Sequence, residues 1–229
     1  MVGYKNLLAV RRKTTEDFFE MMDEHLKMNR SMECIIADYG SDDGIKEFLD
    51  SYRSIHLPVE VYPDQYLNLP KCYNASVMKA KNNIVASVGC DMRFDQKLIE
   101  GVIELYTILG EMILRVLCIK LNRHGRPFRT TFSPYFLWKE HIIKSGGYDE
   151  RIFGWGKEDD DIMERIFKYQ NVLEIRCRNL KYYHVWHDDS FKNQYDSEDI
   201  SKNRNTQISI ENIINNGKNL INSYWQIEK

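Results

Sequence analysis

A short apolar strand that runs straight into a cluster of turn formers constrains the fold of this chain more than any other feature. Residues 33–37 (Glu-Cys-Ile-Ile-Ala) have the character of a buried strand, and residues 38–44 (Asp-Tyr-Gly-Ser-Asp-Asp-Gly) are turn formers. A helix is predicted to follow, from about residue 45 to 52. Strands that alternate with helices in this way predict an α/β fold.

The same order recurs further along the chain. A predicted strand at 84–88 runs directly into Gly-Cys-Asp91, and a helix is predicted at 96–109. In open α/β sheets, ligands bind at the carboxyl ends of the strands. We therefore expect Asp38 and Asp91, which follow two such strands, to lie at a functional edge.

The remaining elements follow from apolar periodicity. The further predicted helices are 16–28, 71–81, 138–144, 158–169 and 199–216. The further predicted strands are 59–62, 112–121, 172–176 and 181–185, and residues 122–127 are predicted to form a polar turn.

Composition excludes several classes of protein. Lys and Arg (32) nearly balance Asp and Glu (34), which argues against a nucleic-acid-binding protein. The five cysteines are odd in number and form no Cys-x-x-Cys pair, which argues against a disulfide framework and a thiolate zinc site. No apolar run is long enough for a transmembrane helix. We expect a cytoplasmic protein, and peripheral association with a membrane or a partner enzyme is compatible with this expectation.

The segment 154–161 (Gly-Trp-Gly-Lys-Glu-Asp-Asp-Asp) carries the strongest chemical signal. Four consecutive acidic residues fit a solvated helix start, because carboxylates favour a helix N-terminus. The Gly-Trp-Gly loop ahead of them favours a sugar site instead, since glycines let the backbone bend around an aromatic ring that stacks on a sugar. An acidic residue near the helix start is then placed to act as a general base.

A metal site is the second candidate. Asp91 at a strand end offers an oxygen ligand of the kind that Mg²⁺ or Mn²⁺ prefers. His184 and His187 are three residues apart, so they would share a helix face but point to opposite sides of a strand. Neutral imidazole binds Mn²⁺, although a histidine is more often a packed or surface residue.

These motifs together resemble a known family. Residues 146–150 (Gly-Gly-Tyr-Asp-Glu) and 154–161 are similar to the C-terminal half of the β-1,4-galactosyltransferases, and also to chondroitin-synthase-like and polypeptide N-acetylgalactosaminyltransferase enzymes. All are glycosyltransferases of the GT-A fold. The resemblance implies an α/β, Rossmann-like nucleotide-sugar-binding fold, with a mixed central sheet flanked by helices.

The resemblance also implies roles for individual residues. Asp159 would be the catalytic base, with Glu158 beside it. The implied nucleotide-sugar-binding residues are Asp38, Lys71, Asn74, Asp91, Trp155 and Gly156. The implied acceptor-binding residues are Trp155, Asp160 and Tyr148. The implied ligands of a Mn²⁺ or Mg²⁺ cofactor are Asp91 and His184, with His187 as the rival of His184.

The implied organisation is one GT-A domain over 1–229, with a nucleotide-sugar-binding half at 1–95, an acceptor and catalytic half at 110–190, and a C-terminal helix at 198–229. The implied activity is inverting transfer of a hexose or N-acetylhexosamine from a UDP-sugar to a glycan hydroxyl, in surface-polysaccharide synthesis.

Two departures from the family pattern support an alternative. The motif reads Gly89-Cys90-Asp91 where the family has Asp-x-Asp, and only two residues precede Gly3 in the first strand. The alternative is a catalytically impaired relative that binds glycans or supports a partner enzyme. A nucleotidyltransferase shares the acidic strand ends but leaves the Gly-Trp-Gly loop unexplained.

Overall fold

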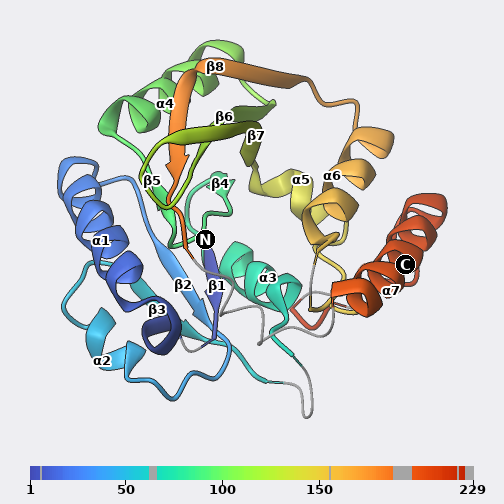
Figure 1. The fold of residues 1–229 in the computed structure, drawn as a ribbon. Helices are drawn as coiled ribbons and strands as arrows, with labels where there is room; N and C mark the ends of the chain where they lie inside the picture. Colours follow the sequence, from blue (N-terminus) through green and yellow to red (C-terminus); the bar gives the residue numbers. More distant parts are fainter. Residues whose placement is uncertain (6, 62–65, 155, 188–197, 221, 225–229) are drawn as a thin grey trace.

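The fold consists of two sheets with helices packed around them (Figure 1). The computed structural model describes residues 1–229 except 6, 62–65, 155, 188–197, 221 and 225–229. The first sheet is parallel, in the order β1 (Val2–Tyr4), β2 (Ile35–Asp38), β3 (Ile55–Pro58). The second is mixed, in the order β4 (Ile84–Ala86), β7 (Pro127–Trp138), β6 (Ile113–Leu121), β8 (Glu174–His184), β5 (Met92–Arg93).

Helices cover both faces of the parallel sheet and surround the mixed one. The described helices are α1 (Leu7–Met28), α2 (Ile45–Leu49), α3 (Leu69–Lys79), α4 (Gln96–Leu109), α5 (Lys139–Lys144), α6 (Glu158–Tyr169) and α7 (Glu198–Asn215). In Figure 1, α1 and α3 lie on opposite sides of β1 and β2, and α6 lies beside α7. None of the described helices is both long and apolar enough to cross a bilayer.

The strand β2 shows why its sequence is a continuous apolar run. Ile36 packs against Phe18 of α1, whereas Ile35 packs among residues of α3 such as Val77. Successive side chains of a strand point to opposite faces, and here both faces are covered. All four residues of β2 are therefore buried, and its carboxyl end delivers Asp38 to the sheet edge.

Hydrogen bonds join the first sheet to the mixed sheet, and apolar packing joins the mixed sheet to the helices. The amino group of Met1 donates to the carbonyl of Ala86 (2.8 Å), and the amide of Val88 donates to the carbonyl of Met1 (2.9 Å), so the start of β1 lies beside β4. On the mixed sheet, Leu114 packs with α4, whereas its neighbour Ile113 faces the core under α3, α5 and α6.

The predicted α/β class, with a mixed sheet flanked by helices, is confirmed, although the strands divide between two sheets. The predicted helices 96–109 and 158–169 match α4 and α6. Because β4 and β5 lie in the mixed sheet, the predicted halves 1–95 and 110–190 share that sheet. The proposed division of the chain stays a prediction.

Two strand predictions were wrong. The strand predicted at 59–62 lies four residues earlier, because β3 pairs with β2 from Ile55 opposite Ile35 to Pro58 opposite Asp38. The strands predicted at 172–176 and 181–185 form one strand, β8, which keeps its pairing with β6 across a register shift. The predicted turn at 122–127 connects β6 to β7, and β7 itself was not predicted.

Candidate active site

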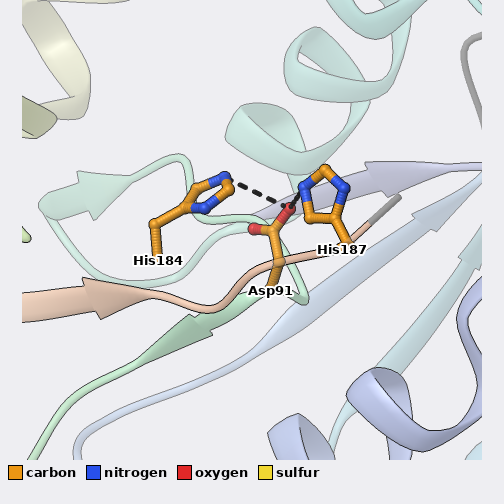
Figure 2. Close-up of side chains that lie close together, drawn as sticks. All are labelled: Asp91, His184 and His187. Carbon is orange, nitrogen blue, oxygen red and sulfur yellow. Dashed lines mark ion pairs between the residues drawn. The ribbon is translucent and has the colours of Figure 1, made fainter. Parts of the chain in front are cut away.

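Asp91 and the two histidines converge on one point (Figure 2). Asp91 follows β4 and precedes β5, and His184 ends β8, which pairs with β5 through Met92 opposite His184. The Nε2 atoms of His184 and His187 lie 3.6 Å and 3.1 Å from Asp91 Oδ2. The chain leaves the strand after His184, so His187 is not bound to strand geometry and its ring returns to the same side. Both rivals for the predicted ligand position therefore reach Asp91.

The electrostatics favour an ionised Asp91 beside a neutral His184. Burial opposes ionisation of Asp91, but the hydrogen bond from His187 and the positive charges around it lower its pKa to about 2. Burial lowers the pKa of His184, which outweighs the attraction of Asp91 and leaves its ring neutral at pH 7. One carboxylate oxygen and two imidazole nitrogens fit Mn²⁺, and fit it better than Mg²⁺, which prefers oxygen ligands alone.

Gly89 allows this position of Asp91. A Cβ atom at residue 89 would lie 2.4 Å from Asp91 Oδ1, closer than side-chain atoms approach one another. The residue that departs from the family's Asp-x-Asp motif is thus the one that leaves room for the carboxylate. In its present orientation, Asp91 is incompatible with a side chain at residue 89.

The four acidic residues at the start of α6 have separate environments. Asp161 is buried and pairs with Arg165, whose Nη2 lies 2.7 Å from Asp161 Oδ2. Asp160 is exposed and pairs with Lys157 (3.0 Å). Glu158 and Asp159 are half-buried, and neither forms an ion pair with another described residue. The run is therefore neither a uniformly solvated face nor a uniform ligand set.

The loop ahead of α6 bends as the glycines predicted. Gly154 (φ 75°) and Gly156 (φ 80°) both have left-handed backbone conformations, which glycine adopts without steric cost. The Gly156 carbonyl accepts a hydrogen bond from Asn205 of α7 (2.9 Å). Trp155, predicted to bind donor and acceptor, lies outside the described residues.

A cavity of about 230 Å³ connects the two parts of the site. Asp91 and His184 line it, and Asp159 lines it from α6. Tyr73 of α3 and Tyr148 also line it, with their ring centroids 5.2 Å apart. The predicted metal ligands and the predicted base therefore face one enclosed space, with two aromatic rings in its wall.

Burial and mutual repulsion raise the pKa values of the acidic pair, Glu158 and Asp159. Burial raises the pKa of Glu158, and the nearby Asp159 raises it further. Burial also raises the pKa of Asp159, with Asp160 adding to the effect. Both carboxyls therefore have a pKa above the ordinary value, as suits groups that take and release protons near neutral pH.

Two of the predicted nucleotide-binding residues, Asp38 and Lys71, are not among the residues that line the cavity. Asp38 is buried at the end of β2, with Oδ2 3.1 Å from His56 Nε2 on β3. The ammonium group of Lys71, also buried, lies 3.5 Å from Glu60 Oε2. These two residues stay candidates for the nucleotide end.

Asn74 contacts the segment that carries Tyr148, and its implied role at the nucleotide stays a prediction. Its amide nitrogen donates to the Tyr148 carbonyl (2.9 Å) and to Glu150 Oε1 (3.1 Å), and its oxygen accepts from the Tyr148 amide (2.9 Å). Both amide hydrogens are therefore used within the protein. Asn74 thereby anchors the segment that carries Tyr148 to α3.

Sequence reasoning did not find three residues around the site. His56 and Tyr73 lie in the predicted nucleotide-sugar-binding half, 1–95, but neither belongs to a motif. Arg11 reaches the candidate metal ligands: its Nη1 lies 2.8 Å from Asp91 Oδ2, although 80 residues separate the two in the sequence. Its backbone (φ −143°, ψ 42°) interrupts α1, and the sequence gives no signal for that interruption.

Sequence comparison finds likeness in the second half of the chain. Residues 128–188 match a family model described as the N-terminal domain of galactosyltransferase. β-1,4-galactosyltransferase 2 of Cricetulus griseus is 29% identical over 102 residues, and that of Mus musculus 28%. The match covers 42% of this chain and 27% of each relative, so it spans about a quarter of the relatives' length.

Solved structures extend the likeness to most of the chain. S. aureus TarS 1–349 in complex with UDP-GlcNAc has a TM-score of 0.66 at 13% identity, and the match covers 92% of this chain and 66% of that one. The mannosyltransferase PcManGT from Pyrobaculum calidifontis, in complex with GDP-Man and Mn²⁺, has a TM-score of 0.64 at 11% identity and covers 95% and 64%. The chain has a GT-A glycosyltransferase fold.

A third solved structure has a similar fold. GalNAc-T7 with UDP, GalNAc and Mn²⁺ has a TM-score of 0.56 at 12% identity, covering 70% of this chain and 39% of that one. The segment 128–188 includes Asp159, His184 and His187. Sequence likeness to the galactosyltransferases is thus concentrated where the predicted base and both histidines lie, and the fold likeness extends beyond it.

Proposed function

We propose that this GT-A protein transfers a hexose or an N-acetylhexosamine from a UDP-sugar to a hydroxyl group of a glycan, with inversion and with a divalent cation. One observation carries the proposal: the same cavity is lined by Asp91, His184 and Asp159. Solved structures of the same fold contain UDP-GlcNAc, UDP with Mn²⁺, or GDP-Man with Mn²⁺, which supports a nucleotide-sugar donor.

The donor end is proposed to lie at the first sheet and at Asp91. Asp38, at the carboxyl end of β2, is the candidate contact for the uracil ring. Asp91, His184 and His187 are the candidate ligands of Mn²⁺. When bound there, the ion supplies positive charge that offsets the charge on the departing diphosphate.

Asp159 is proposed to be the base. As the acceptor oxygen forms its bond to the anomeric carbon, the bond from that carbon to the diphosphate breaks, and Asp159 takes the proton of the hydroxyl. A single displacement inverts the configuration. Asp159 suits this role better than Glu158 because Asp159 lines the cavity and Glu158 is not among the lining residues.

The aromatic wall supports a glycan acceptor. Tyr73 and Tyr148 line the cavity together with Asp159, and their ring centroids lie 5.2 Å apart. Aromatic faces pack against the C–H face of a sugar while nearby oxygens accept its hydroxyls. Tyr148 is held in place by Asn74, which fixes the backbone amide and carbonyl of the tyrosine.

Release of UDP tests the proposal. The purified protein is incubated with several UDP-hexoses and UDP-N-acetylhexosamines, with GDP-mannose as a comparator, in the presence of mixed glycan acceptors. We expect UDP release that needs both an acceptor and Mn²⁺ and that stops with a chelator. Calorimetry with UDP and Mn²⁺ accompanies it. Absence of UDP binding at millimolar concentration would overturn the proposal, and binding without transfer would favour the glycan-binding alternative.

A further inference from the structure

Arg11 contacts two of the three residues of the candidate metal site. Its Nη1 atom donates to Asp91 Oδ2 (2.8 Å), and its Nη2 atom donates to His187 Nδ1 (3.0 Å). The side chain is only 10% exposed, and the Asp91 side chain 11%. The guanidinium group is thus a buried cation that touches two of the three candidate ligands.

The backbone at Arg11 makes this contact possible. Residue 11 departs from helical geometry (φ −143°, ψ 42°) inside α1, so the helix is interrupted at the residue that reaches Asp91. The side chain of the next residue, Arg12, is 63% exposed, and its Nη1 lies 3.7 Å from Glu16 Oε1. Two neighbouring arginines therefore differ in placement, one in the site and one in solvent.

The hydrogen bond to His187 affects which ring nitrogen can bind a metal. Arginine has only donors, so Nδ1 of His187 must accept from it. In a neutral ring the hydrogen then lies on Nε2, the atom that faces Asp91 Oδ2 at 3.1 Å. A nitrogen that carries a hydrogen has no lone pair for a metal. Ligation through Nε2 requires the hydrogen to move to Nδ1, and the contact with Arg11 is then lost.

The charges also indicate that Arg11 and a divalent ion cannot both stay bound to Asp91. A ligand oxygen lies about 2.0–2.2 Å from a divalent ion of this size. An ion bound to Asp91 Oδ2 would therefore lie within a few ångströms of the guanidinium group, which is 2.8 Å from the same oxygen. Both cations would compete for one buried carboxylate, and they would repel each other.

We propose that Arg11 is a resident cation that fills the metal site of the metal-free protein, and that it must withdraw from Asp91 and His187 before a divalent cation binds. Arg11 is thus a positioning residue that holds Asp91 and His187 together and sets the affinity for metal. The proposal rests on the metal site of the proposed function. It differs from a purely supporting role for Arg11, in which removal of the side chain would weaken metal binding.

Metal affinity separates the two roles. Binding of Mn²⁺ alone, without nucleotide, is measured by the electron paramagnetic resonance signal of the free ion. Arg11→Gln and Arg11→Met remove the charge and retain much of the side chain, and Arg12→Gln is the matched control. A neighbouring charge changes the affinity of a carboxylate for a proton by about ten- to a thousandfold, so we expect both Arg11 variants to bind Mn²⁺ at least about tenfold more tightly than wild type. Arg12→Gln should bind as wild type does.

A second measurement guards against loss of structure. Circular dichroism and the melting temperature without metal identify any variant that does not fold, and two variants at residue 11 provide an alternative. We expect Mn²⁺ to raise the melting temperature of the Arg11 variants more than that of wild type. Equal or weaker Mn²⁺ binding by the folded Arg11 variants overturns this proposal and leaves the metal site standing. Absence of Mn²⁺ binding by wild type and variants alike overturns the metal site itself, and the proposal with it.

Discussion

Asp91 and Asp159 line the same cavity, yet their pKa values move in opposite directions. Burial disfavours the charged form of both. Asp91 has Arg11 and His187 within hydrogen-bonding distance, and its pKa falls to about 2. Asp159 has Glu158 and Asp160 as neighbours, and its pKa rises. The cations around Asp91, which Asp159 lacks among its described neighbours, therefore account for the opposite directions of the two pKa shifts.

Two carboxylates within one turn of α6 also differ in their partners, although burial raises the pKa of both Asp159 and Asp161. Asp161 is buried like Asp91 and is likewise paired with an arginine, since Arg165 Nε and Nη2 both donate to Asp161 Oδ2. Asn212 of α7 donates to its other oxygen (3.1 Å). Asp161 thus fastens α6 to its surroundings, while Asp159, two residues earlier, lines the cavity and has no comparable pair among the residues that the structure describes.

The largest expected effect is on catalysis. Asp159→Asn keeps the shape of the side chain and removes its ability to accept a proton, so turnover should fall by about 10²–10⁴-fold. Binding of UDP, measured by calorimetry, should persist because the donor end is untouched. Glu164→Gln, an exposed change on the same helix, is the control and should leave turnover unchanged. A normal rate for Asp159→Asn would remove it from the role of base.

The next effect concerns stability. Arg165→Met leaves Asp161 buried without its cation and should lower the free energy of unfolding by about 3–5 kcal/mol, as measured by urea denaturation. The double variant Asp161→Asn with Arg165→Met removes the charge as well, and it should recover part of the loss. Equal losses in the single and double variants would show that the uncompensated charge is not the cause.

The smallest effect tests the opposite signs directly. The lowered pKa of Asp91 means that its ionised form stabilises the fold above its ordinary pKa of 3.8, and that this stability is lost as the pH falls towards 2. The raised pKa of Asp159 means the reverse: its contribution is present below 3.8 and is lost as the pH rises through the raised pKa.

Two aspartate-to-asparagine variants in chelator should therefore differ in sign at pH 7. Asp91→Asn should lower the free energy of unfolding by about 2 kcal/mol. Asp159→Asn should raise it, with an increase in melting temperature of about 2–4 °C for each kcal/mol gained. At pH 3 both differences should shrink. Changes of the same sign at pH 7 would contradict the comparison between the two carboxylates.

The sequence predicted the parts of the site that depend on local pattern. The helix α6 has strong periodicity and two glycines ahead of it, so its start and the bend before it were predictable. The strand end at Asp91 followed from the apolar run before it. The strand β7 was missed because its first half is exposed and Pro134 interrupts its pattern.

The contacts that decide chemistry were not predictable in this way. Nothing in the sequence pairs Arg11 with Asp91, because the contact depends on an interruption of α1 and on the packing of β5 against β8. Likewise, four adjacent acidic residues look alike in the sequence. Their division into a core ion pair, a surface pair and a cavity-lining carboxylate depends on where Arg165 and Lys157 lie around the helix.

Gly89 has a consequence for the tolerance of the chain to substitution. It has no side chain with which to bind metal, sugar or nucleotide, yet any other residue would place a Cβ atom 2.4 Å from Asp91 Oδ1. Asp91 has little freedom to yield, because Arg11 and His187 hold its other oxygen. A screen that scores every substitution by activity would rank Gly89 with the residues that do chemistry, although what it provides is empty space.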